Sequence, residues 1–563
     1  MTTQGRRPLP RSSVTARQSY DYVIVGSGFG GSVSALRLAE KGYRVLVLEQ
    51  GKRFADQDFP RSNWHVWNFL WLPALRLHGF MRLTFFKEAM VLHGCGVGGG
   101  SLVYANVLME PDAELFEEPE WRRLADWRTI LRPHYATARR MLGVTVTPKL
   151  ARADEILRQV AVSYGLGDTF RPTEVGVYFG EPGVEQADPF FGGEGPPRAG
   201  CQFCGGCMVG CRHNAKNTLT KNYLHLAEKR GAAIRAESRV LGIYPEGDGA
   251  GGGRFVVEFR RSTSLRPARE AVAADRVIVA AGTLGTLDLL FRCREEIGSL
   301  PRLSPHLGER VRTNSEALLG AGARRATVDY SEGIAISADV RVDDVTHVQA
   351  VRYPKGSSFM RLLSGPLIEA RNERFWRRAW RAAGAILRHP LDFLRSLIGP
   401  RWAERTTILL VMQRVENFMN LRWRRGSLLV PRGMRAERDL TRPVPGEIPQ
   451  AHRVVRDFAA RAGAVPMGNT AETLFNMAAT AHLIGGCPMG ASAEEGVVDP
   501  QCQVHNYPGL YVIDGTVLPA NPGINPSLTI TALAEYAMSL IPAKEPRRGV
   551  AGLTAAPSTP PSA

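Results

Sequence analysis

The stretch YDYVIVGSGFGG at residues 20–31 decides the fold. An apolar strand runs directly into a glycine turn, a helical pattern follows, and a second apolar strand, YRVLVL at 43–48, ends on an acid. In such a strand–helix–strand unit the first glycine permits the tight turn, the second lets the backbone approach a pyrophosphate, and the last lets helix and strand pack closely. The unit therefore predicts a Rossmann-like dinucleotide site, with contacts from Gly26, Gly28, Phe29, Gly31 and Glu49.

The acid at the end of the second strand narrows the choice of dinucleotide. A carboxylate at Glu49 would accept hydrogen bonds from ribose hydroxyls and would repel a 2′-phosphate. The N-terminus of the helix after the glycine turn would receive the phosphates. FAD or NAD is therefore favoured over NADP.

Three later turns are of the same style. The segment HGCGVGGGSLVYANVLM at 93–109 has five glycines in seven positions, and each would cost about 1 kcal/mol relative to alanine inside a helix or strand. Such a backbone suits close approach to a flat ligand. The apolar strand 275–281 runs into GTLG, and the strand 510–513 runs into an Asp-Gly pair with a helix at 527–540 beyond it. The cofactor contacts predicted from these turns are Gly96, Gly99, Gly100, Ser101, Gly282, Asp514 and Gly515.

Four cysteines follow a loop-like, glycine- and proline-rich segment at 150–200. Cys201, Cys204, Cys207 and Cys211 have the spacing C-x2-C-x2-C-x3-C of bacterial iron–sulfur clusters, although arginine replaces the proline that usually follows. Four thiolates could also hold zinc, and four packed, reduced thiols are the third alternative. Eight cysteines in 563 residues are too few for a disulfide framework. The spacing leaves these three alternatives open.

The chain is strongly basic, with a formal net charge of +17 and an isoelectric point near 9.8. No nucleic-acid-binding motif accompanies the charge, so no nucleic acid is expected as a partner. The segment 371–405 combines nine arginines and three acids with interleaved aromatics. Trp376, Trp380 and Leu387 fall near one helical face and arginines on another, which is typical of a helix on a membrane surface. The alternative is an ordinary amphipathic helix packed on its own protein.

A second apolar segment, NWHVWNFLWLPALRLHGFMRLTFF at 63–86, is either a core-facing or lid element, or has a lipid-facing or substrate-entry role. The mean hydropathy of −0.15 and the lack of a clean 18-residue apolar run argue against spanning helices. No apolar signal segment precedes the first strand, so the expected location is the cytoplasm, with peripheral attachment at the inner membrane face through 371–405.

Five motifs in this order resemble the glucose-methanol-choline (GMC) oxidoreductase family, and within it the cholesterol oxidase type. They are GSGFGG, GCGVGGGSLV, VIVAAGTLG, AHLIGGCPMG and YVIDGTVLPANPGINPSLTITALAE, and together they cover almost the whole chain. The cysteine run and the missing signal segment differ from secreted members and are similar to an intracellular actinobacterial branch. The resemblance implies FAD, an apolar alcohol substrate such as a 3-hydroxysteroid, and hydride transfer to flavin N5, with roles in lipid, steroid and cholesterol metabolism.

The same resemblance assigns catalytic residues. His482 matches the family's active-site histidine, and Asn525 matches the asparagine of its GVNP-like motif, here GINP. A neutral imidazole is suited to take or hold the hydroxyl proton near pH 7, and the amide can stabilise charge that develops on reduced flavin. A carboxylate for double-bond isomerisation is assigned to Glu404, with Glu416 as its competitor.

The resemblance also implies the architecture. We expect an α/β protein with a Rossmann-like FAD-binding domain built from both ends of the chain, and an α+β substrate domain with an antiparallel sheet. The predicted boundaries are 1–19 for a flexible N-terminus, 20–130, 201–320 and 471–545 for the FAD domain, 131–200 and 321–470 for the substrate domain, and 546–563 for a disordered tail.

Two enzyme functions are compatible with these residues. The first is an oxidase that passes electrons from a sterol-like alcohol to O2. The second is an FAD dehydrogenase of sterols or long-chain alcohols that uses another acceptor, with the cysteine run holding an iron–sulfur cluster. A non-catalytic membrane- or nucleic-acid-binding protein is the remote third alternative. The sequence leaves the oligomeric state open.

Overall fold

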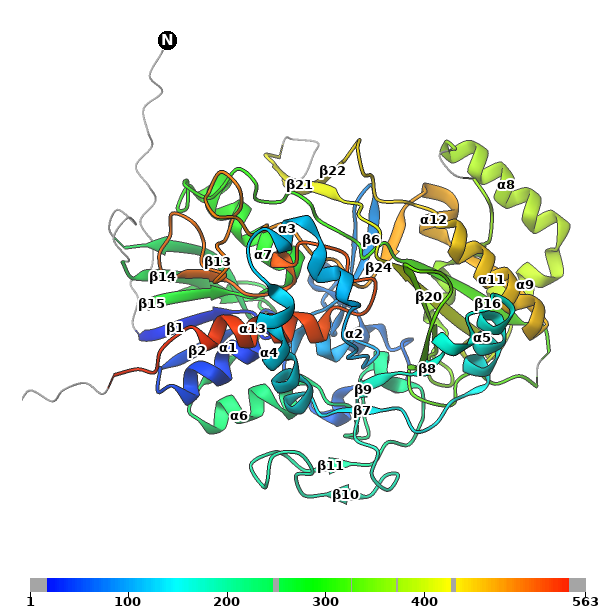
Figure 1. Ribbon diagram of the computed structural model, residues 1–563, viewed down its shortest axis with the longest axis horizontal. Helices are drawn as coiled ribbons and strands as arrows, with labels where there is room; N and C mark the ends of the chain where they lie inside the picture. The colour runs from blue at the N-terminus through cyan, green and yellow to red at the C-terminus, as the bar shows by residue number, and fades with distance from the viewer. Residues whose placement is uncertain (1–17, 247–252, 326, 371–372, 427–431, 546–563) are drawn as a thin grey trace, which may run out of the picture.

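The computed structural model describes residues 18–246, 253–325, 327–370, 373–426 and 432–545 (Figure 1). The predicted C-terminal tail and all but the last two residues of the predicted flexible N-terminus lie outside these ranges. Two large sheets lie side by side, one toward each end of the long axis. Segments from the start and the end of the chain meet at the first of them.

The first sheet has the strand order β12–β2–β1–β15–β14–β13, with β25 added on β15. β12, β2, β1, β15 and β25 are joined by parallel pairs, whereas β13, β14 and the first half of β15 pair antiparallel. β2, the last four residues of β1 and the last three of β15 are buried apolar runs, as expected where both faces of a sheet are covered. The strands are β1 (Ser19–Val25), β2 (Val45–Leu48), β12 (Ala233–Arg235), β13 (Ser238–Pro245), β14 (Phe255–Arg261), β15 (Arg269–Val279) and β25 (Leu510–Val512).

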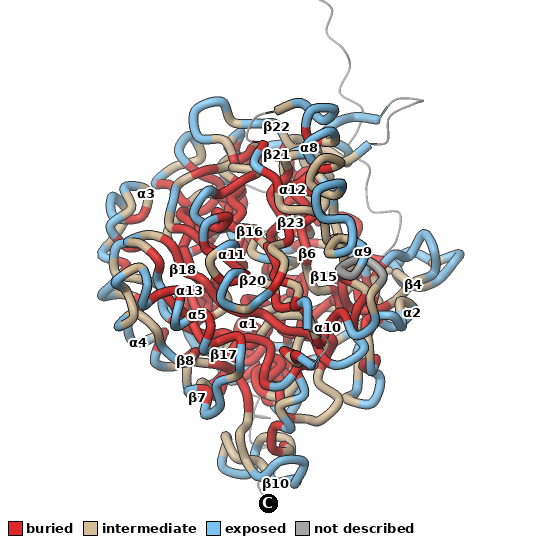
Figure 2. Tube along the Cα trace, turned by 90° about the vertical axis from the view of Figure 1, so that its right-hand side faces the viewer, coloured by how far each residue is buried: buried red, intermediate tan, exposed pale blue. Residues whose placement is uncertain are grey.

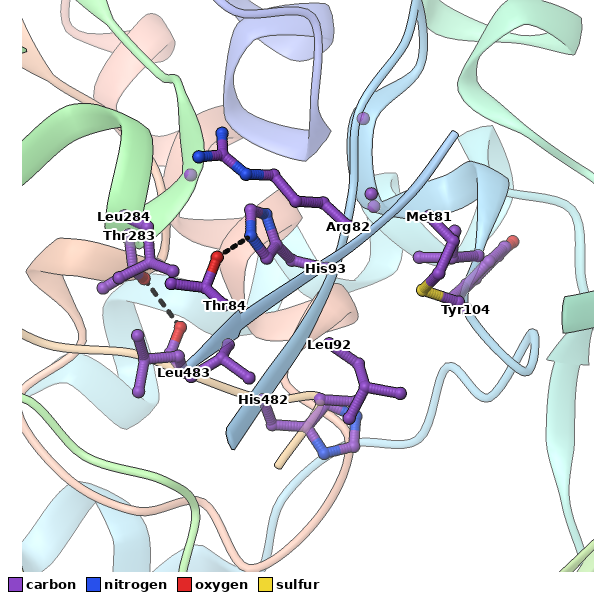
Figure 3. A pocket seen from close by; sticks show the side chains of 18 of the residues that line it. Met81, Arg82, Thr84, Leu92, His93, Tyr104, Thr283, Leu284, His482 and Leu483 are labelled. Atoms are coloured by element: carbon purple, nitrogen blue, oxygen red, sulfur yellow. Dashed lines mark hydrogen bonds between the residues drawn. The ribbon is translucent and has the colours of Figure 1, made fainter. Parts of the chain in front are cut away.

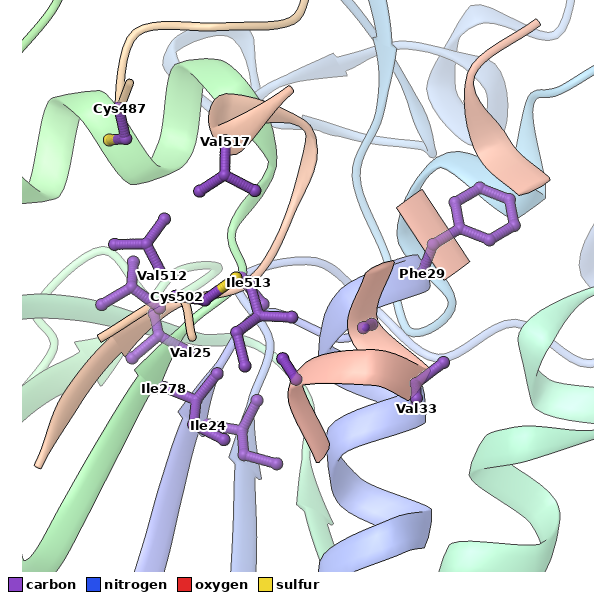
Figure 4. Close-up of a cluster of buried hydrophobic side chains, with 14 of the residues drawn as sticks. Ile24, Val25, Phe29, Val33, Ile278, Cys487, Cys502, Val512, Ile513 and Val517 are labelled. Carbon is purple, nitrogen blue, oxygen red and sulfur yellow. The ribbon is translucent and has the colours of Figure 1, made fainter. Parts of the chain in front are cut away.

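Helices from both chain ends cover this sheet. The helix after the first glycine turn, α1, packs against α13 and α6, and α13 packs against α4. Side chains of β1, β15 and β25 form the buried core beneath them, among them Ile24, Ile278 and Val512 (Figure 4). The helices are α1 (Phe29–Glu40), α4 (Trp127–Met141), α6 (Tyr223–Lys229), α7 (Gly282–Phe291) and α13 (Ser527–Ser539).

The second sheet is antiparallel, in the order β19–β23–β16–β20–β18–β17–β8. Residues alternate across it: in β20, Leu409 and Val411 belong to the core shared with α11 and α5, whereas Ile408 and Leu410 line a cavity on the other face. The elements are β8 (Arg171–Pro172), β16 (Ala317–Ala323), β17 (Ile336–Arg341), β18 (Thr346–Val351), β19 (Ser364–Pro366), β20 (Thr406–Gln413), β23 (Ala464–Asn469), α5 (Arg152–Ser163) and α11 (Pro449–Ala462).

A smaller sheet, β24–β6–β5, leads into the glycine loop. Its strands are β5 (Met81–Phe85), β6 (Ala89–Gly94) and β24 (Ala478–Thr480), and the last of these precedes His482. β5 and β6 pair antiparallel and β24 pairs parallel with β6. This sheet therefore brings the glycine loop and the histidine segment to one place.

A buried ionic cluster ties the second sheet to the segment after the glycine loop. His347 in β18 lies 3.0 Å from Asp339 of β17 and 3.4 Å from Asp112. Burial opposes protonation of the ring, but hydrogen bonds to the two aspartates and their charges outweigh it and raise the pKa of His347 to about 9. The imidazole is therefore charged at neutral pH and contributes to stability.

The segment predicted as a loop at 150–200 contains the helix α5, so that prediction is wrong there. The glycines and prolines around RADEILRQVAVS favour a loop, but its apolar positions form one helix face that packs against α11 and the second sheet. The second sheet crosses the predicted boundary at residue 320, since β16 begins at Ala317, and the domain boundaries stay a prediction. Buried segments run through both regions (Figure 2).

The arginine-rich segment forms three helices, α8 (Phe375–Arg388), α9 (Pro390–Ile398) and α10 (Trp402–Arg405). α8 projects at one end of the molecule, drawn in light green in Figure 1, and contacts α12 (Thr470–Phe475). Within the described part of the chain, every helix is too short or too polar to cross a membrane.

Candidate active site

A cavity of about 450 Å³ lies between the first and second sheets, and Figure 3 shows part of its lining. Its walls come from the strand ends and turns of the first sheet, from one face of the second sheet, and from β5 and β6. One half is lined by backbone-rich turns and the other by apolar side chains. The two halves suit different parts of a ligand.

The backbone-rich half contains most of the predicted cofactor residues. Those that line it are Gly26, Gly28, Phe29, Glu49, Gly99, Gly100, Gly282, Asp514 and Gly515. A Cβ atom on Gly28 would meet nothing within 4 Å, so this glycine faces open space. A Cβ on Gly30 would instead lie 1.7 Å from the Ile513 carbonyl oxygen, which means that α1 packs directly on the end of β25. The turn is tight on the protein side and open on the cavity side, as a bound pyrophosphate requires.

Three predicted cofactor residues do not line the cavity. Gly31 packs against the first turn, since a Cβ there would lie 2.1 Å from the Gly26 carbonyl oxygen. Gly96 accepts a hydrogen bond from the Ser27 hydroxyl at 3.4 Å. Ser101 donates to the Gly98 carbonyl at 2.7 Å and accepts from the Leu219 amide at 3.0 Å. In this structure they shape the two glycine turns.

Two buried carboxylates hold the turns in place. Glu49 accepts from the Ser27 hydroxyl at 2.8 Å and from the Gly51 amide at 2.9 Å. Asp514 accepts from the Gly282 amide at 3.0 Å and from two threonine hydroxyls, and so links the end of β25 to the start of α7. Burial raises the pKa of both carboxyl groups, and the hydrogen bonds oppose that shift. The residues therefore fit FAD: an open glycine cradle at a helix N-terminus, an acid at the ribose position and a glycine loop facing it.

His482 and Asn525 lie together on the cavity lining. The Nε2 atom of His482 is 3.3 Å from Nδ2 of Asn525, and Nδ1 is 2.9 Å from Oε2 of Glu316. A carboxylate only accepts, so this network assigns the proton to Nδ1 and leaves Nε2 with a lone pair. The amide oxygen of Asn525 is buried with no hydrogen-bond partner among the described residues.

Glu316 was not found from the sequence. Its side chain is fully buried, and its carboxylate also accepts from the Thr480 hydroxyl at 2.8 Å and from the Ala481 amide at 3.2 Å. It lies directly before β16, 166 positions from His482, and an acid in TNSEALLG carries no recognisable signal. A second missed residue is His93 of β6, which bonds to Thr84 at 3.0 Å (Figure 3). Burial, with the charge of Arg82, lowers the pKa of His93 to about 3, so its ring is neutral.

The other half of the cavity is apolar. Its walls come from β5, β6, β16, β17, β18, β20 and β23 and from the segment 360–364, with one tryptophan from α10. The apolar lining side chains include Met81, Met90, Leu318, Ile336, Val351, Met360, Leu363, Trp402, Ile408, Leu410 and Met467. A rigid hydrocarbon would be desolvated there, with its polar end directed to His482.

Comparisons with known proteins agree with this geometry. Residues 434–534 match the family profile described as GMC oxidoreductase, and residues 21–341 match that of FAD dependent oxidoreductases. A cholesterol oxidase of Acinetobacter baumannii is 43% identical over 93% of this chain and 95% of its own length.

The chain belongs to the GMC oxidoreductase family.

Other relatives of this GMC oxidoreductase differ in similarity. A cholesterol oxidase of Mycobacterium tuberculosis is 44% identical over 94% of this chain and 92% of its own length. A long-chain-alcohol oxidase of Arabidopsis thaliana is 25% identical over 91% of this chain and 66% of its own length. The crystal structure of pyridoxine 4-oxidase from Mesorbium loti covers 92% of this chain and 99% of its own, with a TM-score of 0.57 and 17% identity, and so supports the fold alone. The predicted family, fold class, FAD cofactor and enzyme class, an FAD-dependent alcohol oxidoreductase, are confirmed.

The carboxylates predicted for isomerisation lie elsewhere in the GMC oxidoreductase. Glu404 is buried but does not line the cavity, and its Oε2 has no hydrogen-bond partner among the described residues. Its other oxygen is 3.8 Å from Arg401. Glu416 forms an ion pair with Arg312 at 2.9 Å. The carboxylate that reaches His482 is Glu316.

The cysteine run lies beside the apolar half of the cavity. Cys201 and Cys207 belong to the same hydrophobic cluster as Leu410. Burial raises the pKa of the Cys204 thiol to about 11 and raises that of Cys201 further. Within the described ranges no group of three or more His, Cys, Asp or Glu side chains is arranged to hold a metal ion. The geometry of the described residues thus gives no support to the cluster or the zinc site.

Proposed function

We propose that this GMC oxidoreductase oxidises the hydroxyl group of a sterol-like apolar alcohol, with FAD as hydride acceptor and O2 as the final electron acceptor. The observation that carries the proposal is the position of the His482–Asn525 pair on a cavity with a glycine-lined half and an apolar half. The two relatives at 43–44% identity are cholesterol oxidases, which favours a sterol over a linear alcohol.

The chain's own residues would hold and move the hydroxyl proton. A hydroxyl group placed beside Nε2 of His482 and Nδ2 of Asn525 can donate to the first and accept from the second. As Nε2 takes the proton the ring becomes an imidazolium, and the Glu316 carboxylate 2.9 Å from Nδ1 stabilises that charge. When bound, FAD supplies the two-electron acceptor that takes the hydride from the carbinol carbon.

The apolar lining has two roles in the proposal. It gains free energy by burying the hydrocarbon part of the substrate, at about 25 cal/mol per Å² of apolar surface removed from water. It also excludes water from His482, which strengthens the interaction between the imidazolium and Glu316.

Anaerobic reduction of the purified FAD-bound protein tests the proposal. Cholesterol dispersed in detergent should bleach the flavin faster than a long-chain primary alcohol, and His482→Ala should slow bleaching by about 10²–10⁴-fold, the usual contribution of a general base. On admission of air the reduced protein should form hydrogen peroxide. Failure of every sterol to bleach a loaded flavin would refute the substrate class, and turnover with a dye but without peroxide would refute O2 as acceptor.

Isomerisation of a steroid double bond is a separate step that needs a carboxyl group in reach of the ring. Glu316 lines the cavity and Glu404 does not. If the wild-type protein releases a conjugated enone, recognised by its ultraviolet absorbance, the Glu316→Gln variant should release the unconjugated ketone instead. The Glu404→Gln variant should still release the conjugated enone. The reverse pattern would return the role to Glu404.

A further inference from the structure

The exposed face of α8 is apolar, which is the reverse of an ordinary surface helix. Trp376, Trp380 and Leu387 are 74%, 77% and 78% exposed. At 100° per residue these three positions fall within about 40° of one another. The face that packs on the protein carries Arg378 and Ala382, which are 1% and 5% exposed. An amphipathic helix that packs on its own protein would turn its tryptophans inward, so that alternative does not describe α8.

A buried arginine holds the helix in this orientation. The guanidinium group of Arg378 donates to the carbonyl oxygens of Thr473 and Ala370 and to that of Glu472 at the start of α12. At the first turn Phe375 stacks on Phe475 with ring centroids 5.5 Å apart. The side chains that anchor α8 are therefore distinct from those that it presents outward.

Basic side chains flank the exposed apolar face. Arg377 and Arg388 are exposed and lie on the side of α8 between the apolar face and the packed face, and Arg374, also exposed, directly precedes the helix. Arg381 on the same side is paired with Glu373. An apolar face bordered by arginines matches the boundary between the headgroups and acyl chains of an anionic bilayer, where aromatic rings enter the boundary and guanidinium groups reach the phosphates.

The apolar surface continues from α8 to the wall of the cavity. α8 contacts α9, whose Leu391 and Leu394 are exposed, and α9 contacts the turn at Phe359–Leu363. Met360 and Leu363 of that turn line the cavity, whereas Leu362 is exposed. The same turn contacts the second apolar segment of the sequence, since the rings of Trp64 and Phe359 are 5.6 Å apart. Trp67, just beyond in α2 (Val66–Phe69), is 69% exposed.

We propose that α8 and α9 form a docking surface for an anionic lipid bilayer, which brings the apolar half of the cavity next to the membrane. The docking does not depend on the proposed function. Only the delivery of a lipid-dissolved substrate to the cavity rests on the proposed function. Figure 2 looks onto the end of the molecule that carries α8 and α9, and β4 (Leu77–His78) and α2 lie at its right-hand edge.

Sedimentation of the full chain with vesicles tests the docking surface. The protein should bind vesicles of phosphatidylcholine mixed with phosphatidylglycerol at low salt, and binding should weaken at high salt and with phosphatidylcholine alone. Trp376→Ser with Trp380→Ser should weaken binding at least about tenfold, and Arg377→Glu with Arg388→Glu should weaken it about fivefold or more for each arginine. Leu265→Ser, an equally exposed leucine on the β14–β15 turn, is the matched control and should change nothing.

Three outcomes would overturn the proposal. They are no binding to anionic vesicles at low salt, equal binding by the double tryptophan variant and the wild type, and a concentration-dependent dimer that this variant abolishes while vesicles stay unbound. The last outcome would identify a second copy of the chain as the occupant. Flavin bleaching by a detergent-dispersed alcohol needs no membrane and is measured on the same samples. A protein that bleaches but does not bind vesicles refutes the docking alone, and a protein that binds vesicles but does not bleach refutes the proposed function alone.

Discussion

Replacing Glu316 by glutamine removes the charge behind His482 and keeps the shape of the side chain. The glutamine oxygen can still accept from Nδ1 of His482 at the observed 2.9 Å, so the ring should keep its orientation. What is lost is the attraction between a carboxylate and the imidazolium that forms when Nε2 takes the substrate proton. Glu316→Gln should therefore lower kcat and leave KM nearly unchanged, because the missing interaction is made mainly in the transition state.

The size of this effect follows from the hydrogen bond. A hydrogen bond to a charged group contributes about 1.5–3 kcal/mol and a neutral one about 0.5–1.5 kcal/mol, so the expected loss is about 1–2 kcal/mol. That corresponds to a decrease in kcat of about 5- to 30-fold. The Glu316 side chain is fully buried, so solvent does not screen the interaction.

The assay is the rate of anaerobic flavin bleaching at saturating alcohol, with FAD content and melting temperature measured on the same preparation. Glu404→Gln is the control, because Glu404 is another buried carboxylate but does not line the cavity. It should change the bleaching rate by less than about twofold, in line with a residue remote from the chemistry. The reasoning is refuted if Glu316→Gln bleaches as fast as the wild type, or if both variants lose the same factor.

Further expectations concern the cofactor turn, the ionic cluster and the cysteines. Gly28→Ala should keep the melting temperature of the apoprotein but weaken FAD binding, because its Cβ would point into the open cradle. Gly30→Ala should instead destabilise the fold, because its Cβ would lie 1.7 Å from the Ile513 carbonyl oxygen. Equal melting temperatures of the two apoprotein variants would contradict this expectation. For His347 the folded-state pKa of about 9 lies above its usual 6.5, so its contribution to stability is complete below pH 6.5 and is lost as the pH rises through 9. The free energy of unfolding should fall across that window with a slope of at most about 1.4 kcal/mol per pH unit, and His347→Gln should flatten the slope. Metal analysis of anaerobically purified protein should find no stoichiometric iron or acid-labile sulfide, and the finding of both would restore the cluster.

Local sequence was sufficient to predict the cofactor turns. A strand that ends in glycines and then continues as a helix is encoded within about a dozen adjacent residues, so β1, α1 and β2 were predictable as a unit. The same holds for the strand that ends in Asp514. The helix α5 was missed because the apolar face of a single helix of twelve residues is a weak signal within a segment rich in glycine and proline.

The sequence by itself determined the GMC family and the FAD-binding turns, because each motif is a short run of adjacent residues. His482 and Asn525 were assigned through two such motifs that lie 43 positions apart in the chain. The tertiary structure alone decided that Glu316 and not Glu404 reaches the histidine, since that depends on which strand neighbours which across 166 positions. It also decided which side of α8 faces outward. Periodicity separates the tryptophans from the arginines, but only the burial of Arg378 against α12 turns the tryptophans away from the protein.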